Sequence, residues 1–152
     1  MKFRTATLWL AALSLLVAWT PVLGQGFELE ALHGSKLRQA ELESGDWVIV
    51  VWANWSPRAR NIGARIDQLS QRFGGRARVC GVHFQDTPDE VRRALGRLPG
   101  APLYVDVRGD FSKHYRVTDL PALLVLRGGR VVHRGRLGAD AEAVVAPLLE
   151  TS

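Results

Sequence analysis

The side chains that could carry chemistry are few: one cysteine, four histidines and a serine between a tryptophan and a proline. Exchange between a dithiol and a disulfide within one chain needs two thiols, and Cys80 is the single cysteine of this sequence. That reaction is therefore excluded, as is an internal disulfide. Cys80 stands between Val79 and Gly81 in an apolar run, where a free cysteine usually packs as a small hydrophobic residue. We expect a buried thiol.

The histidines lack the spacing of a metal site. They are His33, His83, His114 and His133. No H-x-x-x-H or C-x-x-C pattern is present, so we predict no metal and no cofactor. Ser56 would need a base within hydrogen-bond reach to act as a nucleophile, and no histidine is near it in the sequence. The simpler interpretation is that Ser56 caps a helix that begins at Pro57.

The N-terminal segment has the layout of a secretory signal peptide. Lys2 and Arg4 precede an uncharged, mostly apolar run that ends at Gly24. We predict a signal peptide of residues 1–24, cleaved after Gly24, and one mature domain of residues 25–152. An uncleaved anchor is the alternative, since the run is just long enough to cross a bilayer core of about 30 Å. Both interpretations export the domain, either free in the periplasm or held on the inner membrane facing it.

Composition and charge fit one globular domain. Hydrophobic residues make up 47% of the 152 residues and charged residues 23%, values typical of a folded protein. The net charge is +5, and it falls to +3 without the two basic residues of the N-terminal segment. No basic run is interleaved with aromatic residues, so we predict no nucleic-acid partner. Membrane contact is expected only if the N-terminal segment is retained.

Periodicity of the apolar residues predicts an α/β domain. The expected elements are a short edge strand at 27–30, a turn at 33–35, a buried strand at 47–52, a helix from 57 to 73, a strand at 76–84, a helix at 87–98, a short strand at 103–107, a helical turn at 110–115, strands at 122–126 and 131–133, and a helix at 140–149. Gly128-Gly129 predicts a tight hairpin between the last two strands. Pro147 is expected to kink or shorten the last helix. Alternation of strands and helices before a final hairpin predicts a mixed sheet flanked by helices.

The segment from Val50 to Arg60, V-V-W-A-N-W-S-P-R-A-R, resembles the active-site segment of the thioredoxin superfamily. It is most similar to the exported TlpA/ResA-like branch, which reads roughly F-W-A-x-W-C-P-x-C-R. The matching positions are Trp52, Ala53, Trp55, Pro57 and Arg60. Ser56 and Ala59 stand where that branch has its two cysteines, so the CxxC motif is degenerate.

A second segment supports the same resemblance. Residues 117–122, V-T-D-L-P-A, are similar to the V-x-x-x-P segment of the family, whose proline is cis and faces the active-site loop. The resemblance extends from Phe27 to Leu149 and implies a thioredoxin-like fold. Two other family positions are also changed: Val50 replaces a buried acid, and Ile62 replaces a glutamate. The resemblance thus implies the scaffold of a thiol-disulfide oxidoreductase without its redox pair.

Our leading hypothesis is a non-catalytic module that binds a protein or an extended peptide in envelope redox or cytochrome-maturation processes. The resemblance implies a groove formed by Trp55, Pro57, Arg58, Leu120 and Pro121. Such grooves pair backbone groups with an extended chain and need no cysteine. The alternative is an oxidoreductase that retains a redox role through Cys80 or through the cysteines of a partner.

Three arginines form the remaining pattern. Arg58, Arg65 and Arg72 recur every seven residues, which would place them on one face of a helix that begins at Pro57. A solvated helix face is the simpler interpretation. A basic stripe beside the active-site loop, suited to an anionic group, is the alternative.

Overall fold

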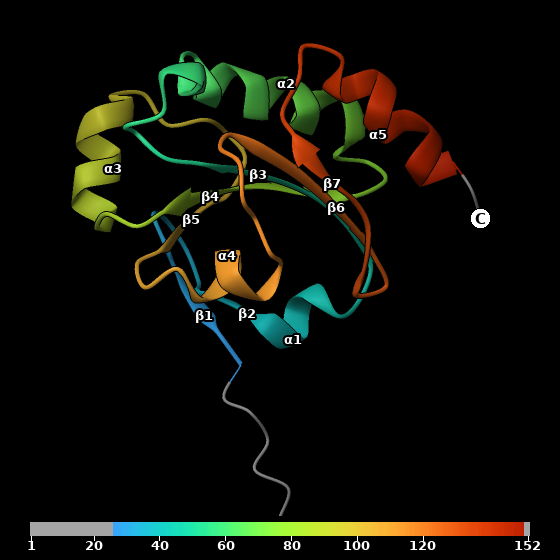
Figure 1. Cartoon of the computed structure of the whole chain (residues 1–152), viewed down its shortest axis with the longest axis horizontal. Helices are drawn as coiled ribbons and strands as arrows, with labels where there is room; N and C mark the ends of the chain where they lie inside the picture. Colours follow the sequence, from blue (N-terminus) through green and yellow to red (C-terminus); the bar gives the residue numbers. More distant parts are fainter. Residues whose placement is uncertain (1–25, 151–152) are drawn as a thin grey trace, which may run out of the picture.

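A computed structural model describes residues 26–150, and the expected signal peptide lies outside them. Seven strands form one mixed sheet with the order β2-β1-β5-β4-β3-β6-β7 (Figure 1). The strands are β1 (Glu28–Ala31), β2 (Leu37–Arg38), β3 (Asp46–Trp52), β4 (Arg78–Phe84), β5 (Leu103–Asp106), β6 (Ala122–Arg127) and β7 (Arg130–Arg136). The helices are α1 (Gln39–Leu42), α2 (Ile62–Phe73), α3 (Pro88–Leu95), α4 (Asp110–His114) and α5 (Ala141–Glu150), with a 3-10 turn η1 at Pro57–Ala59.

Inside the sheet, β3 lies parallel to β4 and antiparallel to β6. Every residue of β3 after Asp46 is buried, because helices cover both faces of the sheet. The continuous apolar run at 47–52 therefore correctly predicted a strand covered on both faces. In the register of β3 and β4, Trp52 pairs with His83, which brings these two side chains to the same end of the sheet.

The two faces of the sheet have separate hydrophobic cores. One core contains β-strand side chains and the apolar faces of α2, α3 and α5, with Ile66, Phe73 and Val145 fully buried. The other contains Phe111 of α4 and Leu42 of α1 on the opposite face. Figure 1 shows these two helical layers above and below the sheet. The predicted mixed sheet flanked by helices is confirmed.

The hairpin of β6 and β7 is also confirmed, with positive φ angles of 53° at Gly128 and 79° at Gly129. Helix α5 continues through Pro147 to Glu150. Among residues 26–150, every helix is too short or too polar to cross a membrane.

Three local predictions were wrong. The sequence did not reveal β2 and α1, which are 2 and 4 residues long and show no period that could identify them. The helix predicted at 87–98 ends at Leu95, where Gly96 takes a φ of 64°. The helix predicted from Pro57 begins only at Ile62, because the 3-10 turn η1 precedes it and Asn61 adopts a left-handed φ of 58°.

Candidate functional site

The loop that follows β3 carries the degenerate motif. It is built from two successive turns, with the Ser56 N–H donating to the Ala53 carbonyl at 3.1 Å and the Ala59 N–H donating to the Ser56 carbonyl at 3.0 Å. Ser56 occupies the N-cap position of η1, as predicted, but its side chain makes no capping hydrogen bond. Its Oγ instead donates to the Leu120 carbonyl at 3.1 Å, a hydrogen bond between residues 64 positions apart. Ser56 therefore ties the motif loop to the segment that precedes Pro121.

That hydrogen bond commits the hydroxyl proton of Ser56 to a carbonyl group. A serine nucleophile needs its proton directed at a base, and the partner here is the Leu120 carbonyl oxygen, which cannot accept a proton for catalysis. Ser56 is also 93% buried, with an exposed fraction of 7%. The geometry agrees with a structural role for this residue.

The predicted groove residues surround this contact. The Leu120–Pro121 peptide bond is cis, Pro121 is buried and Leu120 is half-buried. On the other side of Ser56, the Trp55 side chain is 67% exposed, the largest exposure among the large hydrophobic residues of the described chain. Pro57 and Arg58 are exposed as well. The structure thus places the motif loop and the Leu120–Pro121 segment next to each other.

The alternative of a basic stripe of three arginines finds no support. Arg58 lies in η1, and the break at Asn61 changes the helical register before α2 begins. The Arg65 guanidinium is engaged by the backbone, since it donates to the carbonyls of Leu137 at 3.2 Å and Gly138 at 2.7 Å. These hydrogen bonds hold the segment that connects β7 and α5. Arg58 and Arg72 remain exposed and separate.

A buried histidine supports the start of the motif loop. His83 of β4 is fully buried, and its Nε2 accepts a hydrogen bond from the Asn54 backbone N–H at 3.1 Å. Its Nδ1 lies 2.8 Å from the Gln85 carbonyl. Because a carbonyl only accepts, Nδ1 carries the proton and Nε2 is unprotonated. The imidazole is therefore neutral, and it fixes the backbone at Asn54.

Burial disfavours a charged His83, whereas the Gln85 carbonyl, Asp86 and Glu90 favour it. Asp86 Oδ2 lies 3.6 Å from Nε2 and favours a charged imidazole. Burial disfavours the charge and is the larger effect, so it lowers the pKa of His83 below its ordinary value of 6.5. The Asp86 carboxylate instead accepts a hydrogen bond from the Asn54 side-chain amide at 3.3 Å.

Trp52 lies beneath the same loop. It is fully buried, and its ring meets the His83 ring edge-to-face with centroids 5.1 Å apart. Its indole Nε1 has no hydrogen-bond partner in the described chain. Gly81 of β4 leaves room for this ring, because a Cβ at position 81 would lie 2.7 Å from Trp52 Cζ3.

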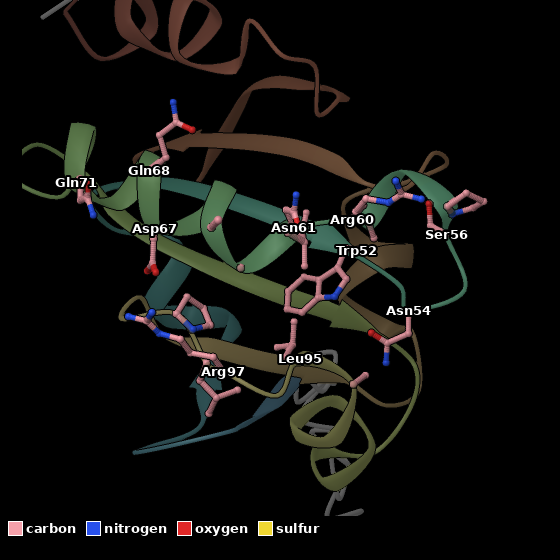
Figure 2. A pocket seen from close by; sticks show the side chains of 18 residues that line it. Trp52, Asn54, Ser56, Arg60, Asn61, Asp67, Gln68, Gln71, Leu95 and Arg97 are labelled. Carbon is pink, nitrogen blue, oxygen red and sulfur yellow. The ribbon is translucent and has the colours of Figure 1, made fainter.

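A cleft of about 830 Å³ opens between α2 and α3. Ser56 of the motif loop and Leu95 of α3 both line it (Figure 2). Of the predicted groove residues, Pro57 lines the cleft, whereas Trp55, Arg58, Leu120 and Pro121 do not. The motif loop therefore borders this cleft, and most of the predicted groove lies outside it.

The environment of Cys80 disfavours the thiolate form. Its side chain is buried in β4, with an exposed fraction of 1%, and burial raises the pKa of its thiol to about 12. The expectation of a buried thiol is confirmed. Within residues 26–150, no group of three or more histidine, cysteine, aspartate or glutamate side chains is arranged to hold a metal ion.

No protein-family model matches this sequence, and no curated protein matches it significantly. Solved structures are similar in fold. The exposed lipoprotein thioredoxin of Streptococcus pneumoniae superposes with a TM-score of 0.69 at 20% identity, over 81% of this chain and 97% of that one. The secreted Mycobacterium tuberculosis disulfide oxidoreductase homologous to E. coli DsbE has a TM-score of 0.61 at 18% identity, over 79% and 95%.

A third structure, the thioredoxin domain of a thiol-disulfide oxidoreductase from Bacteroides vulgatus, has a TM-score of 0.68 at 12% identity, over 82% of this chain and 94% of that one. The chain therefore has the thioredoxin-like fold of thiol-disulfide oxidoreductases, as the resemblance implied. Both cysteine positions of the motif hold other residues, Ser56 and Ala59.

Sequence reasoning missed His83, Asn54 and Asp86 as parts of the site. They come together across β3 and β4, at a separation of 29 residues between Asn54 and His83. One signal was available: a histidine inside an apolar strand run must find hydrogen-bond partners when buried.

Proposed function

We propose that this chain is an exported, non-catalytic module that binds an extended polypeptide along the Trp55 side of the motif loop. The observation that carries the proposal is an exposed tryptophan beside a fixed backbone segment. Trp55 is 67% exposed, and its neighbour Ser56 holds the Leu120 carbonyl. Exposed aromatic residues beside rigid backbone are typical of binding hot spots.

The Leu120 backbone supplies the polar part of the groove. Its carbonyl accepts from Ser56 Oγ, while no hydrogen bond among residues 26–150 uses its N–H group. An extended chain beside Leu120 would offer a carbonyl to this N–H, as in other complexes in which a peptide pairs with backbone groups. Trp55 would then cover an apolar side chain of the same peptide. Neither contact needs a thiol.

The redox alternative finds little support in the geometry. A thiol with a pKa of about 12 is almost entirely protonated at neutral pH, and the thiolate is the reactive form. Cys80 also lies in the strand core, where a substrate disulfide cannot reach it without local opening. A role through a partner's cysteines would still use the Trp55 groove, so it is a variant of the binding proposal.

Export is part of the proposal. The N-terminal pattern of residues 1–24 supports it, and two of the similar solved structures are described as exposed or secreted proteins. An envelope redox or cytochrome-maturation process is the setting in which such a module would hold a thiol-bearing chain without reacting with it.

The test uses a polypeptide that cannot undergo thiol chemistry: reduced, alkylated insulin B chain, titrated against residues 25–152 by fluorescence anisotropy. Trp55→Ala is expected to weaken binding by about tenfold or more, the loss of 1.4 kcal/mol or more that defines a strong contact. Val107→Ala is the matched control, because Val107 is an exposed hydrophobic residue, at 43%, outside the groove. Its binding should equal that of the wild type.

If Trp55→Ala and the wild type bind the insulin B chain with equal affinity, the proposal that the Trp55 groove binds polypeptides is overturned. Reduction of insulin disulfides by the wild-type chain in the presence of dithiothreitol, above the uncatalysed rate, would overturn the non-catalytic assignment. A Cys80→Ala variant run in the same assay would then show whether Cys80 carries the turnover.

A further inference from the structure

The cleft between α2 and α3 has the size of a small-ligand site. Its volume of about 830 Å³ lies within the range of roughly 300–1,000 Å³ that such sites occupy. Its walls combine apolar side chains, among them Ile62, Leu95 and Leu98, with many polar ones, among them Asn54 and Gln71. This site adjoins the proposed polypeptide groove but does not share Trp55 or Leu120 with it.

An unsatisfied hydrogen-bond donor marks one end of the cleft. Trp52 is fully buried and lines the cleft, and its Nε1–H has no acceptor within residues 26–150. A buried donor without a partner is unfavourable, so an acceptor supplied by a ligand would recover that cost. Figure 2 shows the indole below α2, with Leu95 on one side and its nitrogen directed toward Asn54.

An acceptor with a fixed orientation stands beside this donor. The Asn54 side chain donates through Nδ2 to the Asp86 carboxylate at 3.3 Å, and a carboxylate can only accept. This contact sets the direction of the amide, which leaves Asn54 Oδ1 as an acceptor with no donor in the described chain. The Asn54 backbone N–H bonded to His83 holds the residue in place from below.

We propose that the cleft binds a carboxamide group, whose carbonyl accepts from Trp52 Nε1 and whose N–H donates to Asn54 Oδ1. A carboxylate has the acceptor but not the donor, and its charge would face Asn54 Oδ1. Arg60 and Arg97 also line the cleft, but both are exposed and their charges are screened by water. The carboxamide would enter past Leu95, a partly exposed side chain at the rim of the cleft.

The carboxamide has two possible sources: a small free amide, or an asparagine or glutamine side chain of a bound polypeptide. The experiment is a titration of isotopically labelled residues 25–152, followed by the indole and backbone N–H signals in NMR spectra. Acetamide and acetate are the free probes, matched in size. Two extended peptides that differ only by glutamine or glutamate are the polypeptide probes.

Acetamide is expected to produce saturable shifts at the Trp52 indole N–H and at Gly63 and Ala64, with acetate weaker by about tenfold or more. Ala94→Phe fills the cleft from α3 and should abolish these shifts. Ala143→Phe, also at an exposed helical alanine but on α5, is the matched control and should leave them unchanged. Trp52→Phe removes the N–H while keeping an aromatic ring, and it should weaken acetamide binding to the level of acetate.

The Trp55→Ala variant distinguishes the carboxamide site from the proposed polypeptide groove, since it should leave acetamide binding unchanged. If it weakens the glutamine peptide alone, the amide arrives on a polypeptide. Three results would overturn the carboxamide site: no saturable shift, equal shifts with acetate, or shifts that persist in Ala94→Phe.

Discussion

Trp52 and Trp55 are separated by two residues, yet they occupy opposite environments. Trp52 ends β3 with its ring fully buried between the sheet and α2, and Trp55 is 67% exposed on the loop that follows. Trp52 is buried because it belongs to β3, which is covered on both faces. The exposure of Trp55 follows from the turns at Ala53 to Ala59, because the chain leaves the sheet there.

The difference separates two roles that the sequence motif combines. Trp52 belongs to the core and to the cleft with its unsatisfied N–H, whereas Trp55 contributes almost nothing to the core and is available to a partner. Ser56, directly after Trp55, connects the loop to the Leu120 carbonyl.

The strongest test of this comparison is truncation of each tryptophan. Trp52→Ala is expected to lower the free energy of unfolding by about 3–5 kcal/mol, because it leaves a cavity in the core. Trp55→Ala is expected to change it by no more than about 0.5 kcal/mol, as at other surface positions. Urea unfolding followed by far-UV circular dichroism measures both. Similar losses for the two variants would contradict the assignment of separate roles.

Gly81 provides a second and smaller test. A Cβ at this position would lie 2.6 Å from Leu103 Cδ2, 2.7 Å from Trp52 Cζ3 and 2.8 Å from Ile66 Cδ1. Gly81→Ala should therefore lower the free energy of unfolding by about 1–3 kcal/mol through overpacking. Because Trp52 supplies one of the three contacts, Trp52→Phe should relieve part of this cost.

A double-mutant cycle of Gly81→Ala and Trp52→Phe, measured by urea unfolding, checks that coupling. The double variant should be more stable than the sum of the single effects predicts, by about 0.5 kcal/mol or more. Strict additivity would mean that Gly81 is required by Leu103 and Ile66 alone.

Much of the scaffold could be predicted from the sequence because burial leaves a strong pattern. The apolar run of β3, the Gly128-Gly129 turn and the apolar stripe from Ile62 to Phe73 each have one structural interpretation. The start of α2 was predicted wrongly for a local reason. Ser56-Pro57 is a typical start of a helix, but in this chain it starts the 3-10 turn η1. The left-handed conformation of Asn61 then sets a new helical register for α2.

The site was predictable only where a motif marked it. The proximity of the Ser56 loop and Leu120 followed from the resemblance. The contacts of His83 with Asn54 and Gln85 did not, because they depend on the pairing of Trp52 with His83 across β3 and β4. Strand register of this kind is fixed by the packing of the whole sheet and has no short sequence signature.

The smallest expected effect concerns His83, which supports the loop between the two tryptophans. Burial lowers the pKa of His83 in the folded state below 6.5, so the unfolded chain binds a proton more readily than the folded one. The contribution of His83 to stability is therefore fully present above about pH 6.5 and is lost as the pH falls toward the lower folded-state value. One proton limits the slope to about 1.4 kcal/mol per pH unit.

Urea unfolding between pH 7.5 and pH 5 in wild type, His83→Gln and His114→Gln tests this effect. His83→Gln should flatten the decline below pH 6.5, whereas His114→Gln, at an exposed position of α4, should retain it. In the wild type, protonation of Nε2 would remove the acceptor of the Asn54 N–H, so the Asn54 amide signal should shift only as the pH approaches the lower folded-state pKa of His83. An identical decline in all three proteins would mean that the neutral imidazole does not hold the motif loop, and the support beneath both tryptophans would have to come from Asp86 and the turns alone.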